Sequence, residues 1–249
     1  MSSDRILALK QRFSNRVIVG FKSEDSVALT FDDGPDPHFT PMVTDILRRH
    51  CARATFFVLG RQAELYPHII REIIDSGSEV ANHSYSHPSF SLLSVAERLS
   101  ELKNCQRAIG RSGKLLFRPP HGHASSKTPF WASMRNFATI NWSVDSKDWE
   151  DNDHASILRM LTEYVTPGSV ILLHDRLESA SDARLFDRRG MLTALDIFLA
   201  QRKGSISFST VSEMIAKCEP VCENWDEQLD NAQLRRRQAE YSTLMRNSP

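Results

Sequence analysis

Short apolar runs alternate with longer amphipathic segments along almost the whole chain, and this alternation limits the choice of fold more than any other feature. The runs are short enough for strands, and they lack the polar alternation of a strand with one face in water. Strands that alternate with helices form parallel sheets, and about seven such units indicate a barrel, complete or partial. The predicted strands are residues 17–21, 27–31, 54–59, 79–82, 115–118, 139–144, 169–174 and 206–210, and the predicted helices lie near 40–50, 66–76, 94–111, 153–165 and 189–203.

The length and charge of the chain narrow the range of partners. A chain of 249 residues suits one large barrel domain better than two small domains. Lysine plus arginine and aspartate plus glutamate each total 31, so no overall field recruits nucleic acid or an anionic membrane surface. No apolar run approaches the roughly 20 residues of a membrane span, and the stretch Ile6–Leu9 is too short for a secretory signal. We therefore expect a cytoplasmic protein without a membrane span.

We divide the chain into an N-terminal extension (residues 1–24), a barrel (25–215) and a tail (216–249) that is helical or partly disordered. The tail is charged, and we interpret its run Arg235–Arg237 as a solvated helix face rather than an anion site. The four cysteines are scattered, and only Cys218 and Cys222 lie close together. Because no second pair of cysteines or histidines lies nearby, free thiols are a better interpretation than a zinc site.

Titratable residues gather directly after five of the predicted strands. In a parallel barrel the carboxyl ends of the strands and the loops after them share one face, and chemistry is assembled there. We therefore expect these clusters to meet in one site. The clusters are FDDGP (31–35), NHSYSH (82–87), RPPHG (118–122), VDSKDW (144–149) and LLHD (172–175).

Two of the clusters together predict a metal site. His83 and His87 have the spacing that can bring two imidazoles to one metal ion. One carboxylate of the pair Asp32 and Asp33 can complete a two-histidine, one-carboxylate set that leaves positions open for water and substrate, as catalytic zinc or another divalent metal requires. Since consecutive side chains point in different directions, Asp33 can ligate the metal while Asp32 accepts a proton from the attacking water.

The remaining clusters offer partners for these groups. Arg118 can pair with Asp32 and hold it ionised, and one of Asp145 or Asp148 can anchor that arginine. His174 is a candidate general acid for the leaving group, tuned by the other aspartate.

Two apolar side chains lie within the same clusters. Trp149 and Leu172 can form a small pocket beside the metal, large enough for a methyl group. Either could equally be part of the ordinary core.

The five clusters, in this order and at these intervals, resemble the polysaccharide deacetylases of carbohydrate esterase family four. The similarity spans roughly residues 25–215, and TFDDGP and NHSYSH are its most specific parts. The resemblance implies a distorted (β/α)7 barrel, a TIM-barrel-like single domain, and hydrolysis of an N-acetyl group on an amino sugar. It also implies that Asp32 is the base, that Asp33, His83 and His87 bind the metal, that Arg118 steadies the base, and that His174 is the acid.

One residue departs from the family pattern. The third motif of the family usually carries an aromatic residue, most often tyrosine, where this chain has His121. The implied role of this position is a backbone N–H that helps to bind the oxyanion, which a histidine provides equally well. Its side chain touches substrate, so the choice of sugar or chain length can differ here. The nearby His123 is best read as a solvent-facing loop residue.

The predicted function is a metal-dependent hydrolase that removes acetyl groups from an N-acetylated sugar or oligosaccharide, with zinc as the expected metal and cobalt or nickel as alternatives. The motifs position a metal and a carbonyl but do not recognise the rest of the substrate. An O-acetyl esterase or a deformylase acting on a carbohydrate is therefore the nearest alternative. A non-catalytic carbohydrate-binding barrel is a third, although such a protein would be expected to lose part of the site.

Overall fold

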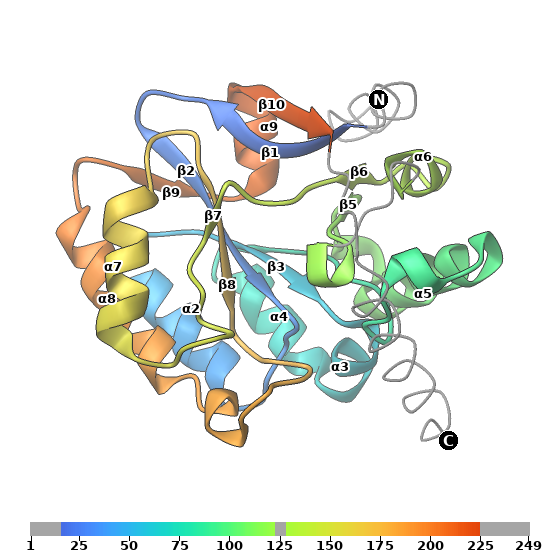
Figure 1. The fold of residues 1–249 in the computed structure, drawn as a ribbon, viewed down its shortest axis with the longest axis horizontal. Helices are drawn as coiled ribbons and strands as arrows, with labels where there is room; N and C mark the ends of the chain where they lie inside the picture. Colours follow the sequence, from blue (N-terminus) through green and yellow to red (C-terminus); the bar gives the residue numbers. More distant parts are fainter. Residues whose placement is uncertain (1–15, 123–127, 225–249) are drawn as a thin grey trace.

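The structure, a computed structural model, describes residues 16–122 and 128–224 (Figure 1). Within these residues, eight strands form one sheet in the order β6-β5-β4-β3-β2-β8-β7, and β9 pairs with β2 beside this path. Every strand pair in the sheet is parallel, as the alternation of strands and helices predicts. The strands are β2 (Ser26–Asp32), β3 (Thr55–Val58), β4 (Glu79–Asn82), β5 (Leu116–Phe117), β6 (Ala138–Thr139), β7 (Val144–Asp145), β8 (Val170–His174) and β9 (Ser207–Ser209).

The two edge strands of the sheet, β6 and β7, are neighbours in the sequence. Only residues 140–143 separate them, and five Cα-to-Cα steps cannot span more than about 18 Å, so the sheet must curl into a partial barrel. The single strand expected over residues 139–144 is therefore wrong. Thr139 pairs with Phe117 of β5, whereas Val144 pairs with Ile171 of β8, and the chain between them crosses from one edge to the other.

A separate two-stranded sheet joins β1 (Arg16–Lys22) to β10 (Glu219–Asn224), which run antiparallel. The first of these strands was expected. The second corrects the prediction that the tail from residue 216 is helical or partly disordered. Its sequence EPVCEN contains a proline and charges, which are tolerated on an edge strand but give no strand signal. Arg235–Arg237 lie outside the described residues.

Helices surround the curved sheet, while β1, β10 and α9 lie together at one end of it (Figure 1). The expected helix near 66–76 is preceded by a short helix that the sequence did not indicate, and Pro67 opens the second one at its first turn, where a missing N–H costs little. No helix among the described residues is long and apolar enough to cross a bilayer. The helices are α2 (Phe39–Arg49), α3 (Gly60–Leu65), α4 (Pro67–Asp75), α5 (Val95–Ile109), α6 (Thr128–Ser133), α7 (His154–Tyr164), α8 (Arg189–Gln201) and α9 (Val211–Lys217), with short 3-10 turns at Phe90–Leu92, Gly110–Ser112, Pro120–Gly122 and Ala183–Phe186.

The central strand β2 is buried on both faces. Leu29 and Phe31 belong to the core between the sheet and the outer helices, whereas Ala28 belongs to a second core that β1 and α9 close. Side chains alternate along a strand, so Thr30 and Asp32 lie on the same inner face as Ala28. The strand therefore delivers the carboxylate of Asp32 into the barrel interior at its carboxyl end.

Candidate metal and catalytic site

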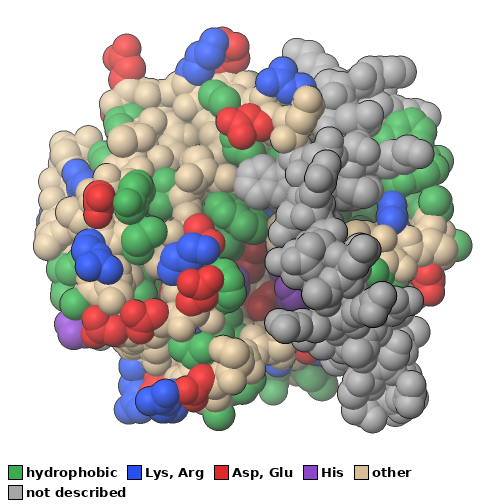
Figure 2. All heavy atoms as spheres, in the orientation of Figure 1, with side chains coloured by type: hydrophobic (Ala, Val, Ile, Leu, Met, Phe, Trp, Pro, Cys, Tyr) green, Lys and Arg blue, Asp and Glu red, His purple; other side chains and the backbone are tan. Residues whose placement is uncertain are grey.

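The sequence clusters meet at the carboxyl ends of the strands. The register of β2 against β8 places Asp32 directly beside His174, and the parallel pairs β2–β3–β4 bring the loop after Asn82 to the same end. Figure 2 shows acidic and histidine side chains together in a hollow of the molecular surface. The site lies where a parallel barrel assembles its chemistry.

Three side chains converge as a candidate metal site. The Oδ1 atom of Asp33 lies 3.3 Å from Nε2 of His83 and 3.1 Å from Nε2 of His87. All three residues are buried, and their candidate ligand atoms lie within 4.8 Å of one another. Among the described residues this is the one such cluster, so none includes Cys218 and Cys222. The four cysteines are free thiols, as expected.

Hydrogen bonds orient this set so that lone pairs face its centre. The Nδ1–H of His83 donates to the backbone carbonyl of Arg118 at 2.8 Å, so in the neutral imidazole Nε2 is the nitrogen with a free lone pair. Asp33 accepts the backbone N–H of Glu178 on Oδ2 at 2.8 Å, whereas its buried Oδ1 has no hydrogen-bond partner within the described residues. A buried oxygen without a donor, flanked by two imidazole nitrogens, fits a divalent cation.

The electrostatics of Asp33 also suit a cation. Burial alone would raise the pKa of its carboxyl group. The two imidazoles beside it, His87 first, instead hold this pKa well below its usual range. Asp33 and His87 have φ angles of 72° and 63°, a left-handed backbone that is costly outside glycine and persists where the surroundings impose it.

The candidate base, Asp32, is paired as predicted. Its Oδ1 accepts a hydrogen bond of 2.7 Å from Nη1 of Arg118, a residue with no exposed surface. The same nitrogen lies 2.8 Å from the hydroxyl of Thr30, and the guanidinium lies 4.2 Å from the ring centre of Phe57. The backbone carbonyls of Ile140 and Asn141 accept hydrogen bonds from its Nε and Nη2 atoms.

The prediction that Asp145 or Asp148 anchors Arg118 is wrong. Asp145 is instead turned toward Lys147, whose Nζ lies 3.2 Å away, and toward the indole N–H of Trp149 at 3.3 Å. Asp145 is the last residue of β7 and Asp148 lies in the loop after it, and neither side chain points toward Arg118. Arg118 is held by the Thr30 hydroxyl and by carbonyl groups, which a sequence pattern does not reveal.

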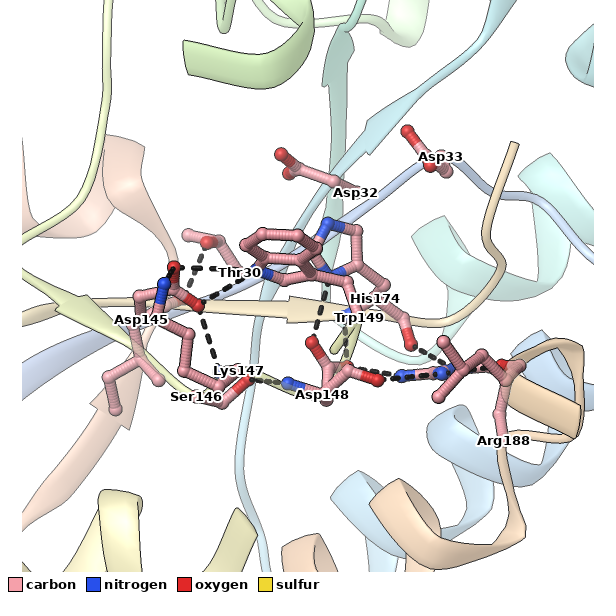
Figure 3. Close-up of polar contacts among 12 residues, drawn as sticks. Thr30, Asp32, Asp33, Asp145, Ser146, Lys147, Asp148, Trp149, His174 and Arg188 are labelled. Atoms are coloured by element: carbon pink, nitrogen blue, oxygen red, sulfur yellow. Dashed lines mark hydrogen bonds and ion pairs between the residues drawn. The ribbon is translucent and has the colours of Figure 1, made fainter. Parts of the chain in front are cut away.

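The second aspartate does accompany His174, and Figure 3 shows the group. The imidazole Nδ1–H donates to Oδ1 of Asp148 at 2.8 Å, and the backbone N–H of His174 donates to Oδ2 at 2.9 Å. Burial alone would lower the pKa of His174. The charge and hydrogen bond of Asp148, with smaller contributions from Asp33 and Asp32, raise it to about 9. His174 is thus protonated at neutral pH.

Sequence reasoning missed Arg188, which is fully buried and donates to Oδ2 of Asp148, the oxygen that also accepts the backbone N–H of His174. It precedes α8, next to the exposed Arg189, and nothing in the local sequence distinguishes the two arginines. The backbone N–H of Glu178, which holds Asp33, was also missed because it lies in a loop and any residue could supply it.

The expected substrate contacts are only partly defined. Leu172 is buried on the inner face of β8, two residues before His174, whereas Trp149 is 40% exposed. His121 is exposed and left-handed, with φ at 59°, and its ring centre lies 4.5 Å from that of His87. His123 lies outside the described residues. The roles of these residues, and of the acid, the base and the metal ligands, stay predictions.

A curled parallel barrel sheet with a buried carboxylate and two imidazoles at its strand ends defines a barrel protein with a candidate site for a divalent cation. Comparison with known proteins makes this class specific. The family model for polysaccharide deacetylase matches residues 20–138. The chain belongs to the polysaccharide deacetylase family, and the predicted family and fold class are confirmed.

Two curated relatives and one solved structure illustrate the similarity. A peptidoglycan-N-acetylglucosamine deacetylase of Bacillus cereus is 37% identical over 71% of this chain and 63% of its own length. A chitooligosaccharide deacetylase of Azorhizobium caulinodans is 35% identical over 68% of this chain and 82% of its own length. The crystal structure of the Bc1960 peptidoglycan N-acetylglucosamine deacetylase has 34% identity and a TM-score of 0.71, and it covers 79% of this chain and 91% of that one. The chain thus spans less than two thirds of the first relative.

Proposed function

We propose that this protein hydrolyses the N-acetyl group of an amino sugar within an oligosaccharide or polysaccharide, with a divalent metal bound by Asp33, His83 and His87. The observation that carries the proposal is the buried convergence of Oδ1 of Asp33 with the two Nε2 atoms. The names of the relatives, which act on peptidoglycan and chitooligosaccharides, support the substrate class.

Zinc suits two neutral imidazoles and one carboxylate with open positions, and cobalt or nickel could replace it. When bound, the ion supplies the positive charge that activates water and polarises the acetyl carbonyl. The chain contributes the orientation of its ligands: the carbonyl of Arg118 sets the tautomer of His83, and the N–H of Glu178 holds Asp33.

Asp32 acts as the general base. Arg118 occupies its Oδ1, so the other oxygen, Oδ2, is left to take a proton from the attacking water. That oxygen lies 3.8 Å from Nε2 of His83, on the side of the metal ligands. A general base that takes a proton from the nucleophile in the transition state typically raises the rate by about 10²- to 10⁴-fold.

His174 acts as the general acid. Its Nδ1–H is held by Asp148, so Nε2 carries the proton that can move to the departing nitrogen. Water adds to the acetyl carbon, the carbon–nitrogen bond breaks, and the nitrogen takes this proton to leave as an amine beside acetate. Leu172 and Trp149 accommodate the acetyl methyl group, and the backbone N–H of His121 helps to bind the oxyanion.

The test is acetate release by the full chain, stripped of metal and then reloaded with zinc, from N-acetylated and O-acetylated glycans. We expect release from N-acetylated oligosaccharides or peptidoglycan fragments, and loss of both activity and bound metal in His83→Ala and His87→Ala. His68→Ala, which changes an exposed histidine of α4, is the matched control. Unchanged metal content in both site variants would contradict the ligand set. Release from O-acetylated glycans alone would indicate an esterase, and binding without release would indicate a non-catalytic barrel.

A further inference from the structure

Arg188 contacts both members of the candidate acid pair (Figure 3). Its Nη2 donates to Oδ2 of Asp148 at 2.5 Å, and its Nη1 donates to the backbone carbonyls of Asp148 and Leu185 at 3.0 and 2.8 Å. Its Nε–H donates to the backbone carbonyl of His174 at 3.2 Å. One planar guanidinium thus bridges the two segments that supply the aspartate and the histidine.

These bonds leave Asp148 a single orientation. Its Oδ2 accepts hydrogen bonds from Arg188 and from the backbone N–H of His174, and its Oδ1 accepts the bond from the imidazole. If the carboxylate rotated, it would break at least one charge-assisted bond inside the protein, where such bonds are strong. The imidazole that Asp148 holds is therefore fixed as well, with Nε2 directed away from Asp148.

The charge of Arg188 determines the net charge that remains in the site after His174 gives up its proton. Arg188, Asp148 and protonated His174 carry a net charge of +1, which falls to 0 when the proton leaves. Without Arg188 the same step would leave a buried carboxylate with no cation, and His174 would hold its proton more tightly. The fully buried Asp148 keeps a lowered pKa because the charges of His174 and Arg188 outweigh its burial.

The surroundings of His174 are otherwise mostly acidic. Beside it, β2 ends at Asp32 and Asp33 follows, and Arg118 is already bonded to Asp32. Lys147 is likewise bonded to Asp145, and Arg176 to Glu178. Arg188 is thus the cation that bonds the acid pair itself. The charged groups on the elements around His174 are Asp32 at the end of β2 and Asp33 after it, Asp145 of β7, Lys147 and Asp148 of the loop after β7, Asp175 and Arg176 beside His174, and Arg188.

We propose that Arg188 is a positioning residue of this site: it fixes Asp148 in one orientation and supplies the charge that lets His174 release its proton to the leaving group. The inference rests on the acid role proposed above for His174. Arg188 would thus control the orientation of Asp148 and the proton release of His174 from a fully buried position.

The test follows the imidazole of His174 by NMR titration in the zinc-loaded full chain, beside the pH–rate profile. In Arg188→Met we expect the pKa of His174 to rise by about one unit, because a nearby positive charge is lost. The alkaline limb of the pH–rate profile should shift to higher pH by the same amount. Arg188→Lys should restore the titration but lower kcat about tenfold, because one ammonium group cannot bridge the same acceptors. Arg189→Met, a charge loss at the neighbouring exposed arginine, should leave both unchanged.

A folded Arg188→Met variant that titrates like Arg189→Met would overturn the inference. If Arg188→Met does not fold, Arg188→Lys decides: wild-type kcat in that variant would show that the bridging contacts are not needed. The NMR titration requires no substrate, so a wild-type protein that releases no acetate would contradict the proposed function without affecting this result.

Discussion

The substitution Asp148→Asn tests the electrostatics of the site most directly. It keeps the size of the side chain but removes the negative charge that raises the pKa of His174 from the usual 6.5 to about 9. With that charge gone, burial is opposed only by Asp32 and Asp33, and we expect the pKa of His174 to fall to about 6.5 or lower. A bound divalent cation offsets the contributions of Asp32 and Asp33 but not that of Asp148, so the direction is the same with metal.

The expected loss of rate follows from the fraction of protonated acid. With a pKa of about 9, about nine tenths of His174 is protonated at pH 8; with 6.5, about 3% is protonated. The activity of Asp148→Asn at pH 8 should thus fall about 30-fold from protonation alone, and much of it should return at pH 6. The assay is a pH–rate profile of acetate release, with Asp187→Asn, at a half-buried aspartate that pairs with the exposed Arg189, as the matched control.

The same pKa predicts how stability depends on pH. The pKa of His174 is raised on folding, so its proton stabilises the folded state fully below pH 6.5, and this stabilisation is lost as the pH rises through about 9. The rise of this pKa from 6.5 to about 9 corresponds to at most about 3.5 kcal/mol of unfolding free energy. Urea unfolding should show this decline in the wild type and not in Asp148→Asn, which is also destabilised at every pH because Arg188 loses its partner. The reasoning would be refuted if the alkaline limb of the pH–rate profile of Asp148→Asn stayed within about half a pH unit of the wild-type limb.

Three further predictions concern the division of roles in the site. Asp32→Asn should lose at least about 10²-fold in rate yet retain metal, whereas Asp33→Asn should lose both; equal metal loss in the two, measured by elemental analysis, would mean that the pair is a shared ligand. His174→Ala should keep its metal and bind substrate while its alkaline limb flattens as the rate falls. If it loses metal, or keeps the wild-type profile at nearly full rate, the acid must be sought elsewhere, with His121 next. Arg118→Met should lower the free energy of unfolding by about 3–5 kcal/mol, because it leaves the buried carboxylate of Asp32 without its partner, and a loss below about 1 kcal/mol in urea titrations would contradict the buried ion pair.

The sequence by itself determined the class of fold and the place of the chemistry. Apolar runs such as 27–31 and 169–174 are buried on both faces, and their period and length are local properties that survive in any tertiary context. Because parallel strands bring their carboxyl ends to one edge, the residues after those runs could be assigned to one site before any contact was known. The metal site could also be predicted locally, from the four-residue spacing of His83 and His87 and from the adjacent aspartates Asp32 and Asp33.

Tertiary structure alone decided which of these groups are partners. Asp145 and Asp148 are equivalent in the sequence as candidates for Arg118, yet neither bonds it, since the direction in which each side chain leaves its loop depends on the curl of the sheet. Arg188 joins the site from the start of α8, and β10 becomes a strand because β1 offers it an unpaired edge. Such pairings depend on distances between segments far apart in the chain, whereas a sequence pattern reports only what neighbouring residues share.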